Sequence, residues 1–162
     1  MTCTRPWRRI TLHFSQIFLT LGRTFTGSAS LVAVRDPATG QVVGGELHLH
    51  AIARKDAERS LKLVGNFSSS IGNWAVCDAI GMQALKPLVK SHQHEIFALA
   101  EKLNASKDPW QRRLSLVLVE WYTRDKKLHP QIKKLVKSLE NDPGYYVKKA
   151  VVWINRNLEK GK

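Results

Sequence analysis

The sequence is poor in cysteine, with only Cys3 and Cys77 among its 162 residues. They lie far apart in sequence, and Cys77 has apolar neighbours in a helical pattern, where an unpaired cysteine usually behaves as a small hydrophobic residue. No CxxC pair occurs, so thiol redox chemistry and a cysteine-held zinc site have no support. We therefore expect a protein of a reducing, intracellular compartment, the cytoplasm.

Other signatures are also missing. No stretch reaches the roughly 20 apolar residues that a membrane-spanning helix needs. There is no glycine-rich phosphate loop and no GxSxG turn, which argues against nucleotide hydrolysis and serine-hydrolase chemistry. His48 with His50, and His92 with His94, are spaced for a strand face more than for a zinc site on a helix. We expect no metal, no cofactor and no membrane partner.

Acidic residues are scarce: 13 Asp and Glu stand against 26 Lys and Arg, giving a net charge of +13. A surplus of this size attracts polyanions. Nucleic acid is the leading partner class, with an anionic membrane surface and ribosomal RNA as rivals. The hydrophobic content of 43% is that of a soluble globular protein, and the length fits one ordinary domain.

The first 50 residues differ from the rest. Residues 1–35 hold five arginines and no acid, which resembles a targeting segment, but their apolar run over 17–21 is short and no clear cleavage site follows it. The stretch "LVAVRDPATGQVVGGELHLH" alternates apolar and polar residues around a turn signal. Residues 1–50 are therefore a leader, either disordered or containing a short hairpin.

Helical periodicity begins near residue 51 and predicts one domain over 51–162. Ser68 to Ser70 offer caps for the second of its helices, while Asp108-Pro109 and Asp142-Pro143 each offer a cap followed by proline at the first helical position. These two Asp-Pro starts lie 34 residues apart, an interval typical of a helix-pair repeat. The predicted helices cover 51–64, 70–86, 92–104, 109–123, 129–140 and 144–159.

Two clusters on these helices suggest a site. Trp74 and Asp78 are four residues apart, so a helix places the indole and the carboxylate on one face. The plainer interpretation is a core tryptophan beside a solvated aspartate. Arg112 and Arg113 lie in the first turn of a helix, where the dipole disfavours cations unless an anion such as a phosphate docks there. Ordinary surface arginines are the alternative.

The last predicted helix carries a third cluster. Tyr146, Lys149, Trp153 and Arg156 follow one another at steps of three and four residues, beside an apolar stripe. Basic residues interleaved with aromatic ones suit a surface that contacts phosphates and sugars together. Trp153 as a core residue is the alternative.

Together, "NWAVCD", "DPWQRRLSLVLVEWY" and "DPGYYVKKAVVWINR" resemble the DNA alkylation repair enzyme family, the AlkD-like DNA glycosylases, over about residues 55–160. The resemblance implies an all-α fold, a HEAT-like helical repeat superhelix or α-α solenoid. It also implies a monomeric base excision repair enzyme acting on double-stranded DNA that contains alkylated bases.

The resemblance further implies hydrolysis of the N-glycosidic bond of cationic purines such as N3-alkyladenine and N7-alkylguanine. Asp78 matches the family's catalytic carboxylate, Trp74 and Trp153 match the aromatics that flank the lesion's sugar, and Arg113 matches an arginine that holds the DNA backbone. Arg112, Tyr146 and Lys149 are expected to add DNA contacts. A base that is already positively charged needs little general acid, so one carboxylate that stabilises the oxocarbenium-like sugar suffices.

The chain departs from the family ahead of Trp74, where members carry further helical repeats, so a form truncated at the N-terminus is expected. Two other classes stay open. A non-enzymatic helical-repeat protein would bind nucleic acid through the same basic face, and a protein-interaction scaffold would keep Trp74, Trp121 and Trp153 as core residues.

Overall fold

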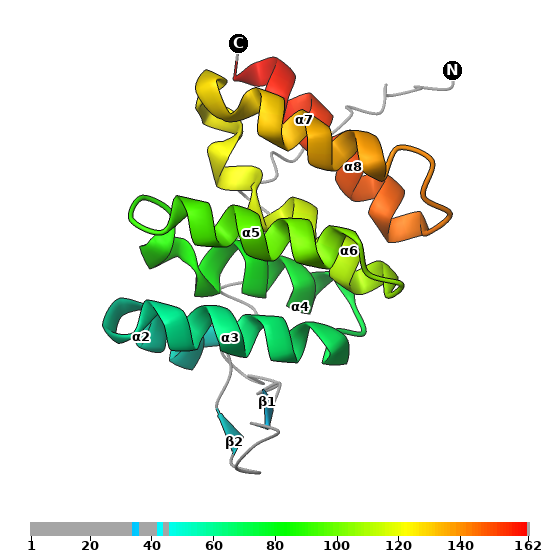
Figure 1. Cartoon of the computed structure of the whole chain (residues 1–162). Coiled ribbons are helices and arrows are strands. Elements are labelled where there is room, and N and C mark those ends of the chain that lie inside the picture. Colours follow the sequence, from blue (N-terminus) through cyan, green and yellow to red (C-terminus); the bar gives the residue numbers. More distant parts are fainter. Residues whose placement is uncertain (1–33, 36–41, 44–45, 162) are drawn as a thin grey trace, which may run out of the picture. The chain divides into compact units, whose positions relative to one another are not determined.

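The computed structural model describes residues 34–35, 42–43 and 46–161 (Figure 1). Most of the predicted leader, with its targeting-segment alternative, lies outside these residues. Within it, strands β1 (Val34–Arg35) and β2 (Val42–Val43) pair antiparallel, with Val34 opposite Val43. The first described helix begins at Glu46, so helical structure starts before the predicted boundary at residue 51.

Helices dominate the described chain, and the fold is all-α as predicted (Figure 1). The π-helical segment Ile80–Ala84 directly continues α4. Single 3-10 turns follow α3 and precede α5, and two more lie between α6 and α7. The helices are α2 (Glu46–Lys55), α3 (Ala57–Phe67), α4 (Trp74–Ala79), α5 (Gln93–Asn104), α6 (Pro109–Leu118), α7 (His129–Ser138) and α8 (Tyr145–Lys160), and the 3-10 turns are Ser68–Ser70, Lys86–Leu88, Glu120–Arg124 and Lys126–Leu128.

The helices form three successive pairs: α3 with α4, α5 with α6, and α7 with α8. The first helices of the pairs begin 36 residues apart, at 57, 93 and 129, and the second helices begin at 74, 109 and 145. Figure 1 shows the pairs stacked in chain order, with α3 lowest and α7 and α8 uppermost. This regular interval is close to the 34 residues between the Asp-Pro starts, and such stacking is how a repeat buries its apolar faces.

Two predicted helix boundaries were wrong because cap residues were missed. The predicted helix over 51–64 is interrupted at Asp56, whose carboxylate accepts a hydrogen bond from the Arg59 amide (2.9 Å) and so starts α3. The predicted helix over 70–86 begins later, at Trp74, because the Asn73 side chain accepts from the Val76 amide (2.9 Å). The serines that were predicted to cap it form a 3-10 turn instead.

Of the two Asp-Pro starts, one behaves as predicted. Asp108 accepts a hydrogen bond from the Trp110 amide (2.8 Å) and Pro109 is the first residue of α6. Asp142 does not cap α8, which begins only at Tyr145 after Gly144. The carboxylate of Asp142 is instead bound by Arg112 and by the Gly144 amide (2.7 Å), and this holds Pro143 outside the helix.

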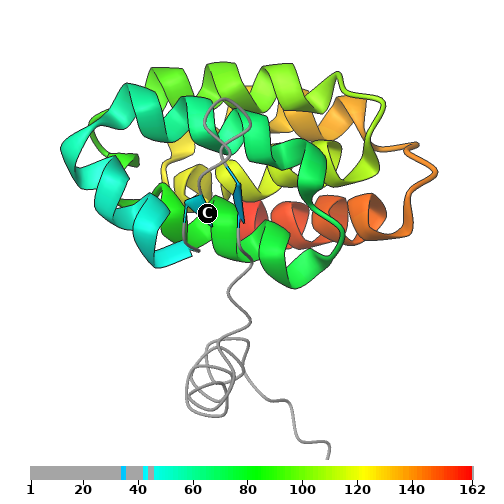
Figure 2. The same cartoon turned by 90° about the horizontal axis from the view of Figure 1, so that it is seen from below.

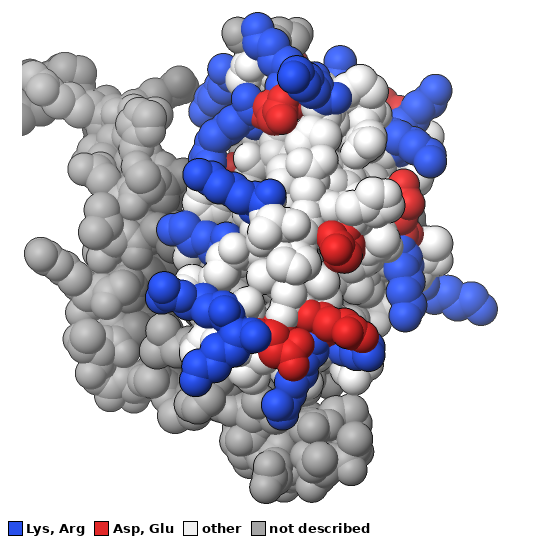
Figure 3. All heavy atoms as spheres, turned by 60° about the vertical axis from the view of Figure 1, so that its left-hand side comes forward, with Lys and Arg blue, Asp and Glu red and all other residues white. Residues whose placement is uncertain are grey.

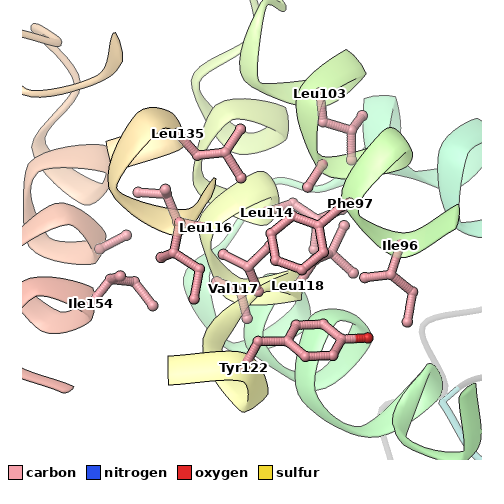
Figure 4. Close-up of a cluster of buried hydrophobic side chains, with 14 of the residues drawn as sticks. Ile96, Phe97, Leu103, Leu114, Leu116, Val117, Leu118, Tyr122, Leu135 and Ile154 are labelled. Atoms are coloured by element: carbon pink, nitrogen blue, oxygen red, sulfur yellow. The ribbon is translucent and has the colours of Figure 1, made fainter. Parts of the chain in front are cut away.

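The core is centred on α6, where every residue from Arg113 to Leu118 is buried. A helix that is buried all round must be covered on all sides, and α4, α5 and α8 pack against it. Figure 4 shows its leucines between Ile96 and Phe97 on α5 and Leu135 and Ile154 on α7 and α8. The Phe97 and Tyr122 rings lie 5.1 Å apart.

Glu120, which follows α6, is a buried carboxylate with a weak set of partners. It is 5% exposed, and its Oε1 accepts from Asn157 Nδ2 (3.3 Å) and lies 4.0 Å from Arg124 Nη2. Its Oε2 is buried without a hydrogen-bond partner. Burial raises the pKa of Glu120, opposed by the Arg124 charge. Because the pKa is raised on folding, the ionised group destabilises the fold at pH values above it.

We therefore expect Glu120→Gln to raise the free energy of unfolding at pH 7 by about 1 kcal/mol, since the amide carries no charge into the interior. The gain should shrink as the pH falls and Glu120 becomes protonated. Urea unfolding at pH 7 and at pH 5, beside the exposed variant Glu101→Gln, measures this. A less stable Glu120→Gln at pH 7 would show that the buried charge is favourable.

Candidate nucleic-acid site on α4, α6 and α8

Trp74 and Asp78 occupy the first two turns of α4, as the predicted helix requires. Trp74 is 42% exposed, whereas Asp78, one turn later, is only 7% exposed. The plainer interpretation of a core tryptophan beside a solvated aspartate does not hold, since the tryptophan reaches solvent and the aspartate is buried. A buried carboxylate is rare unless it is paired, so Asp78 needs a partner from a neighbouring helix.

Arg113 is that partner, because its Nη2 donates to both carboxylate oxygens of Asp78, at 2.7 and 3.0 Å. Arg113 is itself 6% exposed, and its Nη1 donates to the backbone carbonyl of Tyr146 at the start of α8 (2.8 Å). One guanidinium thus ties together α4, α6 and the start of α8. The bonds span 35 and 33 residues, close to the repeat interval, so the three residues come from the second helices of successive pairs.

Burial and the Arg113 charge shift the pKa of Asp78 in opposite directions. Burial raises the pKa of the Asp78 carboxyl, and the charge and hydrogen bonds of Arg113 act against that rise. The Nε of Arg113 is buried without a hydrogen-bond partner. A buried ion pair with an unsatisfied donor is weak evidence for stability and is more typical of a functional site.

An aromatic cluster lies next to the ion pair. The Trp110 ring stacks on Tyr146 with 5.0 Å between centroids and 28° between planes, and Tyr145 meets Tyr146 edge-on at 5.1 Å. Lys149 Nζ lies 4.8 Å from the centre of the Tyr145 ring, which belongs to a residue that is 62% exposed. We did not predict Trp110 or Tyr145 as site residues. Their place in the sequence could have identified them, since each lies within three residues of a residue that was predicted for the site.

Arg112 is occupied elsewhere. Its guanidinium binds both carboxylate oxygens of Asp142, with Nη2 donating at 3.2 Å, and its Nη1 donates to the carbonyls of Ser106 (3.0 Å) and Lys107 (2.7 Å). Although burial alone would raise it, hydrogen bonds from Arg112 and the Gly144 amide hold the pKa of Asp142 below its ordinary value. These contacts give Arg112 a structural task, and its contact with DNA stays a prediction.

Trp153 follows Lys149 by one turn on α8 and is half-buried against the main core. Among the described residues, no ring contact joins Trp153 to Trp74. The face of α8 that carries Tyr145, Lys149 and Val152 is exposed. The structure thus brings Asp78, Arg113 and Tyr146 together, places Lys149 beside them, and leaves Trp153 further along the same helix.

The remaining reactive side chains show no site of their own. Cys77 is a buried free thiol, and burial raises its pKa to about 12. His50 Nδ1 lies 3.0 Å from the Gln83 carbonyl, and His92 Nδ1 lies 2.8 Å from Ser91 Oγ. Within residues 49–161, where side chains are described, no cluster of three or more His, Cys, Asp or Glu could hold a metal ion. None of the described helices is long and apolar enough to cross a membrane.

Comparison with known proteins assigns the chain to a family. Residues 40–161 match the family model described as DNA alkylation repair enzyme. No curated protein and no solved structure gives a significant match. The matched region covers every described helix and all the residues of the candidate site. The chain therefore belongs to the DNA alkylation repair enzyme family.

Proposed function

We propose that the protein is a DNA glycosylase that hydrolyses the N-glycosidic bond of cationic alkylated purines, N3-alkyladenine and N7-alkylguanine, in duplex DNA. Family membership supports a role in DNA repair. The observation that supports this chemistry is the Asp78 carboxylate, held in a fixed orientation by Arg113 one turn from the exposed Trp74. The charge of +13 supplies the attraction for the phosphate backbone.

The chemistry follows from the charge of the lesion. When the bond between the base and C1′ breaks, the base leaves with the bonding electron pair and becomes neutral, so no acid is needed. The deoxyribose develops oxocarbenium character, which the negative charge of Asp78 stabilises. Water adds to C1′ and gives up a proton. Exposed aromatic faces attract the cationic base and sugar by about 0.5 to 2 kcal/mol each.

The direct test is release of N7-methylguanine from alkylated duplex DNA by the 162-residue protein, beside release of hypoxanthine. We expect release of the cationic base and almost none of the neutral one, because the site offers no strong acid for a neutral leaving group. Equal release of hypoxanthine would contradict the charge argument. No release by a folded protein that binds DNA would contradict the glycosylase.

One observation favours a second candidate, a non-enzymatic helical-repeat protein that binds nucleic acid. Both oxygens of Asp78 already accept hydrogen bonds from Arg113, which suits a structural ion pair. A binder gains nothing from a carboxylate near phosphates. In that case Asp78→Asn would leave DNA affinity unchanged or raise it, and wild type would release no base.

Trp153 tests the aromatic contribution. We expect Trp153→Ala to lower kcat/KM for N7-methylguanine release by about tenfold, which corresponds to the loss of one cation–π contact of about 1.4 kcal/mol. The loss should be smaller for a neutral base. Trp121→Ala is the control, because Trp121 is another partly buried indole whose Nε1 donates to the Met82 carbonyl (3.0 Å). Equal effects of the two variants would assign Trp153 to the core alone.

A further inference from the structure

The π-helical segment Ile80–Ala84, here called the wide turn, lies close to Asp78 in the chain. It continues α4 directly, with only Ala79 between it and Asp78. A wide turn holds about one residue more than an α-helical turn, and one residue corresponds to about 100° of rotation about the helix axis. The direction in which the Asp78 side chain leaves the helix therefore depends on how the wide turn is held.

Neighbouring parts of the chain contact three consecutive residues of the wide turn. Gly81 lies so close to α6 that a Cβ would come within 2.6 Å of a side chain there. The Met82 carbonyl accepts a hydrogen bond from Trp121 Nε1 in the turn after α6 (3.0 Å). The Gln83 carbonyl lies 3.0 Å from His50 Nδ1 on α2. Two separate parts of the chain thus hold the wide turn, α6 with the turn after it and α2.

The contact between His50 and Gln83 is a hydrogen bond with a defined direction. A carbonyl oxygen only accepts, so the Nδ1 atom of His50 must carry the proton and donate it. The two residues are 33 positions apart in the chain. Because the acceptor is a main-chain carbonyl, the bond restrains the backbone of the wide turn itself.

The helix that carries His50 stands outside the three helix pairs. Figure 1 shows α2 at the lower end of the stack, and in Figure 2 it lies beside α3. It also packs against the wide turn. His50 was the last residue of the predicted leader and was considered only for a metal site. The structure instead gives its side chain a contact with the segment that continues the Asp78 helix.

We propose that His50 is a positioning residue, whose hydrogen bond to the Gln83 carbonyl holds the wide turn and thereby orients the Asp78 carboxylate toward Arg113 and the reacting sugar. Wide turns inside α-helices occur frequently at functional sites. A misplacement of about 1 Å can lower a rate by about 100-fold. The effect on base release rests on the proposed function, whereas the orientation of Asp78 is measured in the free protein.

The test compares His50→Ala, which removes the donor, with His50→Asn, whose side-chain amide places an N–H donor close to the position of Nδ1. In single-turnover release of N7-methylguanine with enzyme in excess, His50→Ala should be slower by about tenfold. His50→Asn should keep the wild-type rate. Alanine favours a helix more than histidine does, and asparagine about equally, so helix propensity cannot produce this pattern.

DNA affinity should stay at the wild-type value in both variants. Attraction for the phosphate backbone is expected from Lys and Arg side chains, which Figure 3 shows along the border of the face that it brings forward, with fewer Asp and Glu among them. Neither variant removes a Lys or an Arg. A lower rate at unchanged affinity indicates a misplaced catalytic group. An affinity that falls as much as the rate would make His50 a DNA contact and overturn the proposal.

The matched control is His92→Ala, which should keep the wild-type rate. His92 is another partly exposed histidine, but its Nδ1 lies 2.8 Å from the Oγ of Ser91, its neighbour in sequence. A wild-type rate in His50→Ala would overturn the proposal, even if its free energy of unfolding were lower, because the contact would then be purely structural. A loss that His50→Asn does not restore would also overturn it.

Nuclear magnetic resonance of the free protein gives a measurement that needs no base release. The carboxyl carbon resonance of Asp78, identified by its loss in Asp78→Asn, should move in His50→Ala and return to its wild-type position in His50→Asn. A resonance that does not move in His50→Ala would overturn the proposal. If wild type released no base, the glycosylase would fail, and this resonance would still decide whether His50 orients Asp78.

Discussion

Asp78→Asn is expected to lower the rate of N7-methylguanine release by about 100-fold or more while leaving DNA affinity equal or higher. The amide keeps the size of the side chain and removes the charge that stabilises the oxocarbenium-like sugar, and losses of about 100-fold to 1,000-fold are usual when one preorganised group of this kind is removed. Affinity does not fall, because a carboxylate near phosphates opposes binding. Single-turnover release with enzyme in excess, combined with fluorescence anisotropy on undamaged duplex, measures both quantities.

The same substitution also affects stability, so it needs a matched control. Asp78→Asn leaves the Arg113 guanidinium buried without its carboxylate, and breaking a buried ion pair costs about 3 to 5 kcal/mol. Asp142→Asn breaks the ion pair between Asp142 and Arg112, the residue directly before Arg113 on α6. We expect Asp142→Asn to lose stability and to keep its rate of base release in the folded state. An equal loss of release in both variants would assign the effect of Asp78 to folding.

The pH dependence separates the two aspartates further. Because the pKa of Asp142 is lowered on folding, its pair stabilises the protein above the unfolded pKa, and this contribution is lost as the pH falls through the folded value. The pKa of Asp78 is raised by burial, so its ionised fraction falls at a higher pH than that of an ordinary aspartate. Base release should therefore decline on acidification before the Asp142 pair is lost.

Several features of the fold could be predicted from sequence because they depend on local signals. Asp108-Pro109 marks the start of α6 correctly, since cap and proline act within one turn. The interval between the two Asp-Pro starts approximates the repeat that the helix starts show. The residue types on these helices, together with the family resemblance, predicted a site made of Asp78, Trp74, Arg113, Trp153, Arg112, Tyr146 and Lys149. Of these, the structure pairs Asp78 directly with Arg113.

Other features depend on contacts across the repeat and could not be predicted. Asp142 has the same local sequence signal as Asp108, but Arg112 lies 30 residues away and binds its carboxylate. Arg112 and Arg113 are adjacent and look equivalent, yet their guanidinium groups bind different aspartates. The π-helical turn after α4 was also missed, because a single wide turn has no sequence signature of its own.

Gly81, in that π-helical turn, is expected to be intolerant of substitution. A Cβ built on Gly81 lies 2.6 Å from Val117 Cγ1 and 3.3 Å from Leu114 Cδ1, closer than ordinary van der Waals contact. Both neighbours are fully buried on α6, so neither has room to move away. The absence of a side chain therefore lets the end of the Asp78 helix approach the helix that carries Arg113.

We expect Gly81→Ala to lower the free energy of unfolding by about 1 to 3 kcal/mol, as overpacking of a core does. It should also slow base release in the remaining folded protein, because α4 and Asp78 are displaced from Arg113. Gly65→Ala is the control. Gly65 lies inside α3, and a Cβ at this position would lie an ordinary 3.6 Å from Leu99 Cδ1. The substitution should therefore be neutral or raise the free energy of unfolding by up to about 1 kcal/mol.

The double variant Gly81→Ala/Val117→Ala decides whether the close approach is the cause. Val117→Ala alone leaves a cavity and destabilises the core. If the methyl group added at Gly81 fills that space, the double variant should be more stable than the sum of the two single changes predicts, by about 0.5 to 3 kcal/mol, and base release should recover with it. Urea unfolding and single-turnover release on all four proteins complete the cycle. Strict additivity would show that Gly81 is required for its backbone and not for its contact with Val117.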